Sequence, residues 1–264
     1  MTALTEVMKR VLPPKWLGAL KRVLPPRWLD KFKRIFSPKW LGRIRFHLQP
    51  KGQESWGGPF NGQTGRIQIF KAILHECHPI AVVETGTYQG TTTHFLAQST
   101  SKPIYTVEAY GENYGFASER LRGCKNVFLE QGDSRSFLRK CVSKPNLQNG
   151  PVLFYLDAHW EHDLPLAEEI EIIFSALPES IVMVDDFQVP DEKDYGYDDW
   201  GPGKALTSEY IAASCQQFGL LRFFPSIPAH EETGAKRGCV VLAGSPRTVS
   251  KLKRISVLRC SIRS

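Results

Sequence analysis

Four apolar runs in the middle of the chain each end in a residue with a carboxylate side chain. The runs end at Glu84, Glu108, Asp157 and Asp185-Asp186, and a turn follows each of them. Continuous apolar runs that alternate with amphipathic segments predict a parallel sheet with helices on both faces. The carboxyl ends of such strands meet at one edge of the sheet, and ligands bind beyond that edge. The sequence therefore predicts one acidic site to which four strands contribute.

The first run leads into a turn with two glycines, in the string VVETGTYQGTTT over residues 82–93. Glycine lets a backbone approach a ligand closely and permits positive φ. Glu84 would repel a phosphate at this turn, so it favours a ligand with an ammonium group or a ribose diol. Glu108 follows Gly86 by 22 residues, near the spacing at which a second-strand carboxylate binds ribose hydroxyls. The pair predicts a nucleoside-type cofactor, and an ordinary tight turn between strand and helix is the alternative.

The elements that position these residues follow from the hydrophobic periodicity. Strands are expected over residues 81–84, 104–108, 127–130, 151–156, 180–184, 220–224 and 238–242, the last two as an antiparallel hairpin. Helices are expected over residues 66–76, 91–98, 114–122, 135–142, 166–177 and 204–218. The acidic, aromatic insert over residues 187–203 follows the fifth strand closely enough to form a lid with Tyr195, Tyr197 and Trp200.

Charge divides the chain into two parts. Residues 1–50 hold 12 of the 34 Lys and Arg residues against Glu6 and Asp30, so they carry +10, and the rest carries −3 of the net +7. The six cysteines show no Cys-x-x-Cys spacing, which argues against a zinc site and fits a reducing compartment. No run approaches the ~18 apolar residues that span a bilayer, and no signal-peptide core is present. We expect a cytoplasmic protein.

The basic segment is an internal repeat with a period of 12, reading KRVLPPKWLGAL, KRVLPPRWLDKF and KRIFSPKWLGRI over residues 9–44. Each unit places Pro before Trp-Leu, at Trp16, Trp28 and Trp40, and Pro is tolerated in the first helical turn. Short basic amphipathic helices with Trp on the apolar face suit an anionic membrane surface. A docking or oligomerisation arm is the alternative, and a nucleic-acid contact fits the regular Pro spacing less well. We divide the chain into this tail (residues 1–48), a Gly-rich linker or loop (49–65) and a domain (66–264).

From about residue 60 to 245 the chain resembles class I S-adenosylmethionine-dependent methyltransferases, and among them the metal-dependent catechol O-methyltransferase type. The motifs that carry this resemblance are VVETGTYQGTTT, IYTVEAY, Gly132-Asp133-Ser134, FYLDAHW and IVMVDDF. The resemblance implies an α/β, Rossmann-like fold with a mostly parallel seven-stranded sheet and a C-terminal antiparallel hairpin.

It also implies roles for individual residues in binding S-adenosylmethionine. Glu84 would lie near the methionine end, Gly86, Tyr88 and Gly90 would shape the turn, and Thr92 would meet the methionine carboxylate. Glu108 would hold the ribose hydroxyls, while Asp133, Ser134, His159 and Trp160 would surround adenine. Apart from the resemblance, residues 61–64 could also reach the cofactor, because ligand loops are often built this way, and a plain linker is the alternative.

The metal positions of the family correspond to Asp157, Asp185 and Asp186, whose oxygen atoms suit Mg²⁺. Two departures affect the proton acceptor. Ala158 is inserted before His159-Trp160, and the family's lysine base is replaced by Glu161, followed by His162. Asp157, Glu161 and His162 are therefore the catalytic candidates, and the sequence does not choose among them.

The sequence thus predicts an O-methyltransferase that acts on a hydroxyl of a sugar, glycolipid or phenol, assisted by Mg²⁺, with its tail on an anionic membrane. A metal-independent methyltransferase of a small molecule and a non-catalytic membrane-bound scaffold are the alternatives. The sequence makes no prediction about the oligomeric state.

Overall fold

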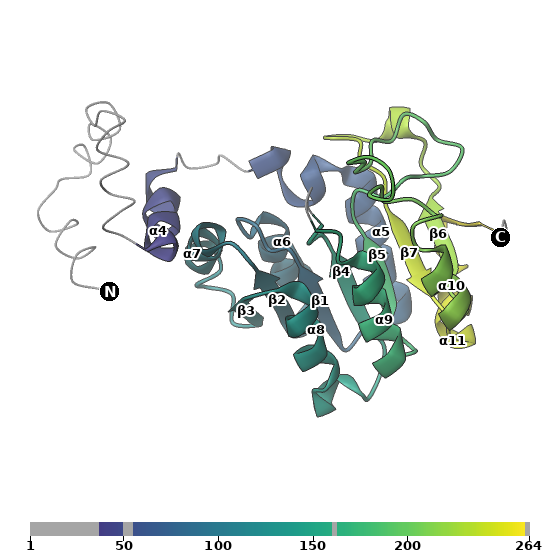
Figure 1. The fold of residues 1–264 in the computed structure, drawn as a ribbon, viewed down its shortest axis with the longest axis horizontal. Helices are drawn as coiled ribbons and strands as arrows, with labels where there is room; N and C mark the ends of the chain where they lie inside the picture. The colour runs from purple at the N-terminus through teal and green to yellow at the C-terminus, as the bar shows by residue number, and fades with distance from the viewer. Residues whose placement is uncertain (1–36, 50–54, 160–162, 262–264) are drawn as a thin grey trace, which may run out of the picture.

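A computed structural model describes residues 37–49, 55–159 and 163–261 of the chain. One mixed β-sheet lies between two layers of helices (Figure 1). Its strands are β1 (Ala81–Thr85), β2 (Ile104–Glu108), β3 (Val127–Gln131), β4 (Val152–Leu156), β5 (Ile181–Val184), β6 (Leu221–Pro225), β7 (Val240–Ala243) and β8 (Leu258–Ser261).

The strand order is β3-β2-β1-β4-β5-β7-β6-β8. Strands β1 to β5 pair in parallel, whereas β7 runs antiparallel to both β5 and β6. The order reverses between β1 and β4, which is the topological switch point where doubly wound sheets bind ligands. The Rossmann-like fold and the C-terminal antiparallel hairpin predicted from the sequence are confirmed.

The prediction of seven strands is wrong by one. Strand β8 pairs antiparallel with β6 and forms the edge of the sheet. Its sequence, Leu-Arg-Cys-Ser, has one buried residue at its start and three half-buried ones. So short a segment has no clear alternation of apolar and polar residues, and only its pairing with β6 defines it as a strand.

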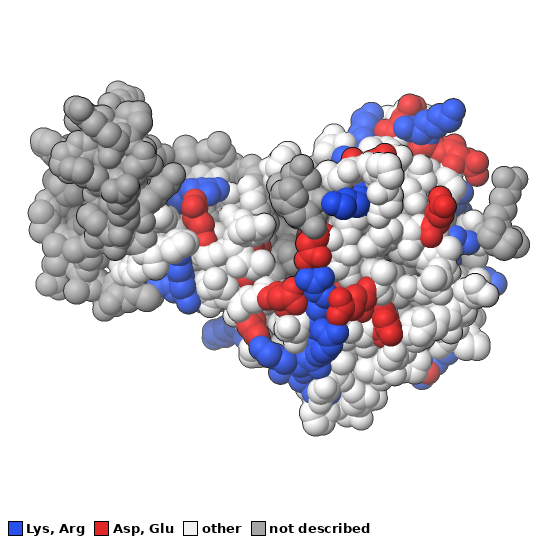
Figure 2. All heavy atoms as spheres, in the orientation of Figure 1, with Lys and Arg blue, Asp and Glu red and all other residues white. Residues whose placement is uncertain are grey.

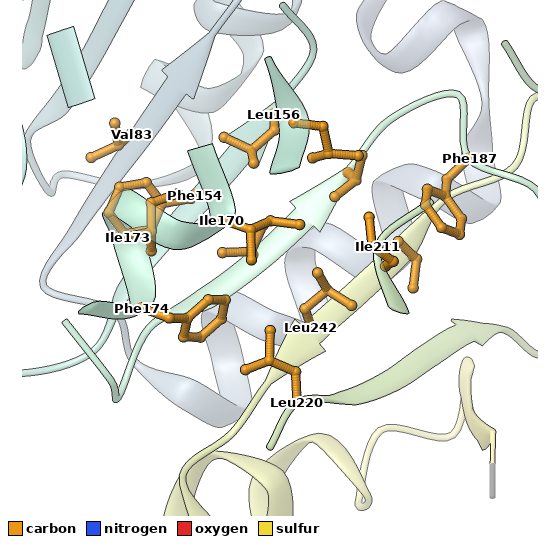
Figure 3. Close-up of a cluster of buried hydrophobic side chains, with 14 of the residues drawn as sticks. Val83, Phe154, Leu156, Ile170, Ile173, Phe174, Phe187, Ile211, Leu220 and Leu242 are labelled. Atoms are coloured by element: carbon orange, nitrogen blue, oxygen red, sulfur yellow. The ribbon is translucent and has the colours of Figure 1, made fainter. Parts of the chain in front are cut away.

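The helices cover both faces of the sheet. They are α5 (Thr64–Cys77), α6 (Thr91–Ser99), α7 (Gly111–Arg120), α8 (Ser134–Val142), α9 (Leu166–Ala176), α10 (Ala212–Phe218) and α11 (Pro246–Leu252). Side chains of α8, α9 and α10 pack with one face of β1, β4, β5 and β7, including Ile170, Phe174 and Leu242 (Figure 3). Side chains of α5, α6 and α11 form a second cluster on the opposite face. Successive buried side chains along β4 and β5 therefore belong alternately to the two cores.

Two segments differ from their predicted form. The helix expected over residues 204–218 is reduced to α10, because Leu206 donates its N–H to Asp198 and accepts one from Gln188 (2.9 and 2.8 Å). The glycine-rich segment contains two short 3₁₀ helices, η1 (Ser55–Gly57) and η2 (Pro59–Gly62), before α5. Two other 3₁₀ turns are η3 (Pro145–Leu147) and η4 (Ala229–Glu231).

Helix α4 (Pro38–Leu48) begins within the third repeat unit, with Pro38 in its first turn as predicted. It lies against α7 at the β3 end of the sheet (Figure 1). The first two units lie outside the described residues. Among the helices described, none is long and apolar enough to cross a bilayer.

Candidate active site

Glu84 lies at the end of β1 and is buried to 1% exposure. Its Oε2 accepts hydrogen bonds from the hydroxyls of Thr93 (2.5 Å) and Thr106 (2.6 Å). Burial raises the pKa of Glu84 to about 7, against the lowering effect of these hydroxyls. Because both bonds end on Oε2, Oε1 is the oxygen available to a cationic ligand, whose charge would restore the ionised form.

The turn after β1 explains both glycines. Gly86 has φ +84°, and a Cβ there would lie 2.1 Å from the carbonyl oxygen of Asp157. Gly90 has φ +75° and packs on Ala117 and Leu121. Any larger residue at position 86 would separate the turn from the end of β4. The turn therefore joins the predicted cofactor residues to the predicted metal residues.

Glu108 ends β2 and is held by the backbone of two neighbouring segments. Its Oε2 accepts from the N–H of Tyr88 (2.7 Å) and its Oε1 from that of Tyr110 (2.8 Å). Burial raises the pKa of Glu108. The Tyr88 backbone is in the left-handed region (φ 49°), and its side chain is 40% exposed. Glu108 thus faces the Gly86–Gly90 turn, as a carboxylate that binds a diol would.

Other residues predicted to bind the cofactor lie at the start of α6, at the start of α8, or outside the described residues. The Thr92 hydroxyl accepts a hydrogen bond from the N–H of Phe60 (3.2 Å), so the linker reaches the start of α6. Asp133 caps α8 by accepting from the N–H of Ser136 (3.1 Å) and pairs with Arg135 (3.0 Å). Ser134 is buried in the first turn of α8. Trp160, Glu161 and His162 lie outside the described residues.

His159 is buried, and neither ring nitrogen has a hydrogen-bond partner among the described residues. Burial lowers the pKa of His159 to about 4, with Asp186 and Arg237 close enough to influence it. The imidazole is therefore neutral at physiological pH. An orphaned, neutral ring beside the acidic residues fits a side chain that meets a ligand.

The three predicted metal residues lie together at the ends of β4 and β5. One carboxylate oxygen each of Asp157, Asp185 and Asp186 lies within 4.8 Å of the others. Burial raises the pKa of Asp157 well above its usual range, and the charges of Asp186 and Glu84 raise it further. The backbone of Asp186 is in the left-handed region, at φ 50°.

Two arginines that the sequence analysis did not single out contact this cluster. Arg66, 2% exposed, forms an ion pair with Asp185 and donates to the carbonyls of Arg237 and Gly238. Arg237 pairs with Asp186 (3.0 Å) and with Asp198. Arg66 was detectable, because it occupies the apolar face of α5 together with Ile69, Phe70 and Ile73. Arg237 lies in a loop without periodicity, so no local pattern marks it.

The structure also differs from the prediction of a lid that contains Tyr195, Tyr197 and Trp200. Tyr195 is buried, and its hydroxyl donates to the carbonyl of Ile227 (2.9 Å), so it is a core residue and not part of a lid. Tyr197 and Trp200 remain half-buried. Asp198, between them, has its pKa raised to about 6 by burial and by Asp186. The insert therefore contributes a carboxylate to the site more clearly than it contributes aromatic rings.

Some, but not all, of the carboxylates in this cluster could hold a divalent cation. Both oxygens of Asp185 are engaged, Oδ1 by Arg66 and the N–H of Asp186 (2.9 Å) and Oδ2 by the Tyr155 hydroxyl (2.5 Å). Asp157 and Asp186 therefore remain as the carboxylates that would hold the ion. Asp157, Asp185, Asp186 and Asp198 outnumber the two arginines, which leaves a formal charge of −2 when all four are ionised. Hard oxygen donors with such an excess suit Mg²⁺.

We expect the affinity for S-adenosylmethionine to rise with pH through the titration of Glu84. The pKa of Glu84 lies at about 7 instead of 4.5. The contribution of Glu84 to the free energy of unfolding is thus fully present below pH 4.5 and is lost as the pH rises through 7. A bound ammonium favours the ionised form, so the dissociation constant should fall by up to about tenfold per unit between pH 5.5 and 7. Calorimetry across this range should show a flat profile for Glu84→Gln, and an equal slope in that variant would contradict the assignment.

No family model and no curated protein matches the chain. Among solved structures it is similar to the O-methyltransferase from Bacillus cereus in complex with S-adenosylhomocysteine (13% identity, 86% of this chain and 96% of that one, TM-score 0.46). It is also similar to the O-methyltransferase TomG from Streptomyces achromogenes in complex with S-adenosylmethionine (14%, 80% and 90%, 0.46). A third is a methyltransferase dependent on S-adenosylmethionine from Aquifex aeolicus (14%, 68% and 91%, 0.43). At these identities and scores, the function has to follow from the residues of the chain itself.

Proposed function

We propose that the chain is an S-adenosylmethionine-dependent O-methyltransferase whose acceptor is a hydroxyl group. The observation that carries this proposal is the placement of Glu84 and Glu108. These two buried carboxylates end adjacent parallel strands on either side of the Gly86–Gly90 turn. They match a ligand that carries an ammonium group at one end and a ribose diol further along, and S-adenosylmethionine has both.

The two carboxylates have different tasks in this proposal. Glu84 would bind the ammonium through Oε1 while Thr93 and Thr106 fix Oε2. Glu108 would accept from the ribose hydroxyls while the N–H groups of Tyr88 and Tyr110 fix its orientation. S-adenosylmethionine supplies a methyl group on a positively charged sulfur.

Asp157 is the carboxylate that links the proposed cofactor site to the methyl-transfer step. The turn at Gly86 contacts its backbone, and Glu84 and Asp186 influence its side chain. In the transfer, the acceptor hydroxyl loses its proton, its oxygen forms a bond to the methyl carbon, and the bond between that carbon and sulfur breaks. The products are a methyl ether and S-adenosylhomocysteine. We propose Asp157, Glu161 or His162 as the group that takes the proton.

A Mg²⁺ ion held by Asp157 and Asp186 would lower the pKa of a coordinated hydroxyl. Arg66 and Tyr155 would keep Asp185 in place, and Arg237 would position Asp186 and Asp198. Tyr197 and Trp200 lie close to Asp198 in the chain, and the N–H of Asp198 donates to the carbonyl of Asp186 (2.9 Å). Half-buried rings beside a carboxylate suit a sugar, and they would also serve a phenol.

A metal-independent methyltransferase is the second candidate, and the two arginines favour it. They already supply two positive charges to the carboxylates that a cation would bind. A non-catalytic scaffold is less consistent with the site, because buried carboxylates at the ends of β1 and β2 cost stability without a ligand.

Transfer of a labelled methyl group to a panel of phenols and sugars tests the proposal. We expect turnover to fall at least about 100-fold in the presence of a chelator, because the ion contributes several kcal/mol of charge stabilisation. Added Mg²⁺ should restore it. Full turnover in the chelator would favour the metal-independent candidate. Binding of the cofactor without transfer to any acceptor of the panel would favour the scaffold.

A further inference from the structure

Helix α4 packs on α7 through small residues. A Cβ added at Gly42 would lie 1.8 Å from the carbonyl oxygen of Glu112, and one added at Gly115 would lie 2.0 Å from that of Lys39. The two helices therefore touch backbone to backbone. Phe46 packs edge-on against Phe116, with ring centroids 5.2 Å apart.

Charged side chains of α4 are used in the same contact. Arg45 pairs with Glu112 (2.7 Å), and Arg43 lies 3.6 Å from Glu119. The Lys39 ammonium lies over the ring of Tyr114, 4.3 Å from its centroid. The three Lys and Arg side chains of α4 thus face acidic or aromatic groups of α7, and they fix the rotation of α4 about its own axis.

The opposite side of α4 is apolar. Residues of an α-helix are about 100° apart, so residues 39, 42, 43 and 46 share the face toward α7. Leu41, Ile44 and Leu48 recur at the same spacing on the other side. They are half-buried and belong to neither of the two core clusters of the described residues. We define these three, with Trp40, as the Trp-Leu stripe.

Comparison of the three repeat units separates the two faces of α4. The positions equivalent to the stripe are Trp28, Leu29, Phe32 and Phe36 one period upstream and Trp16, Leu17, Leu20 and Leu24 two periods upstream. All of them are apolar. The face toward α7 is shared only in part. Lys39 and Arg45 correspond to basic residues in both earlier copies, and Gly42 corresponds to Gly18, whereas Phe46 corresponds to Arg22 and Arg34, and Gly42 corresponds to Asp30 in the second unit. A side chain at position 42 is incompatible with the observed contact.

From this difference we infer that the Trp-Leu stripe is a docking surface for an anionic lipid membrane, and that α4 attaches the domain to it. What the three copies share is the apolar stripe, which in α4 lies on the side of the helix opposite the contact with α7. What distinguishes α4 is the combination of Gly42 and Phe46 on the face toward α7. Arg22 and Arg34 stand where α4 has Phe46, and residues 1–50 as a whole carry +10.

The occupant is a lipid surface because the same apolar positions recur three times in the sequence with a period of 12. Binding of a basic amphipathic helix at an interface grows with its apolar area and with its attraction to anionic lipid. On the face of the domain in Figure 2, acidic and basic side chains lie side by side over α8 and α9, where Arg135 pairs with Asp163 and Arg139 with Glu168. The charge that attracts the membrane therefore belongs to the tail.

Co-sedimentation of the full chain with vesicles tests this inference without any assay of turnover. The vesicles contain phosphatidylcholine with and without about one third phosphatidylserine. The stripe variant Leu20→Ser, Phe32→Ser, Ile44→Ser leaves the charge unchanged, and we expect it to bind anionic vesicles at least about tenfold more weakly. Phe46→Ser is the matched control, since it makes the same kind of change on the α7 face, and it should retain vesicle binding. Circular dichroism should show that both variants remain folded.

Three results would overturn the inference. The full chain would fail to sediment with anionic vesicles, or the stripe variant would sediment as well as the wild type. Alternatively, the wild type would form an oligomer in analytical ultracentrifugation that the stripe variant loses, which would make the stripe an interface between copies of the chain. Weaker binding at higher salt is expected, because exposed charges are screened.

Discussion

Replacing Arg66 by methionine is expected to lower the free energy of unfolding by about 3–5 kcal/mol, the range for removing one partner of a buried ion pair. Arg66 and Asp185 are each almost inaccessible to solvent, and their contact ties α5 to the end of β5. Without the guanidinium, the carboxylate keeps the Tyr155 hydroxyl and one N–H as its donors among the described residues. Urea denaturation followed by circular dichroism measures the loss.

The double variant Arg66→Met, Asp185→Leu serves as the control for this prediction. It removes both charges, so it should recover most of the stability that the single variant loses, because an apolar pair can replace a buried ion pair at little cost. A loss below about 1 kcal/mol in the single variant, the scale of an exposed ion pair, would mean that Arg66 does not neutralise Asp185 in the buried site.

Asp157→Asn is expected to reduce kcat by about 10²–10³, the effect of removing one preorganised electrostatic group from an active site. The substitution keeps the shape of the side chain and removes the charge that would hold a cation or accept a proton. Affinity for S-adenosylmethionine should change little, because Glu84 and Glu108 carry that contact. Single-turnover methyl transfer together with calorimetry separates the two effects.

Asp163→Asn is the matched control for Asp157→Asn. Asp163 is exposed and pairs with Arg135 on the surface over α8 (2.7 Å), so its substitution should leave kcat within twofold, as expected for a surface ion pair worth about 0–1 kcal/mol. If Asp157→Asn retained full activity while a chelator abolished it, the cation would have to be held elsewhere.

The carboxylates of the site were predictable because each follows a strand in the sequence. An apolar run that ends in an acid specifies both the strand and the place where its last side chain lies. For Glu84, Glu108 and Asp157 the parallel sheet brings those ends together, as the sequence analysis expected. The two arginines that pair with the aspartates do not follow a strand in this way. Arg66 and Arg237 reach the cluster from α5 and from the loop before β7, more than 50 residues away in the chain.

The tail shows a different limit of sequence reasoning. Periodicity predicted an apolar face for each repeat unit, and for the third unit it predicted the helix that begins at Pro38. It did not indicate that the third unit packs on α7, because that contact depends on Gly42 opposing the backbone of Glu112 and on Gly115 opposing Lys39. A glycine that permits close packing looks like any other glycine until its neighbour in space is known.

Calorimetric titration of S-adenosylmethionine into the full chain tests the central claim most directly, with Glu108→Ala measured in parallel. The wild type should bind one equivalent, and Glu108→Ala should bind about 1.5–3 kcal/mol more weakly, the scale for losing charge-assisted hydrogen bonds. Glu108→Gln, which keeps the size of the side chain, should fall between them. Absence of binding to the wild type, or equal affinity in Glu108→Ala, would contradict a cofactor seat at the ends of β1 and β2.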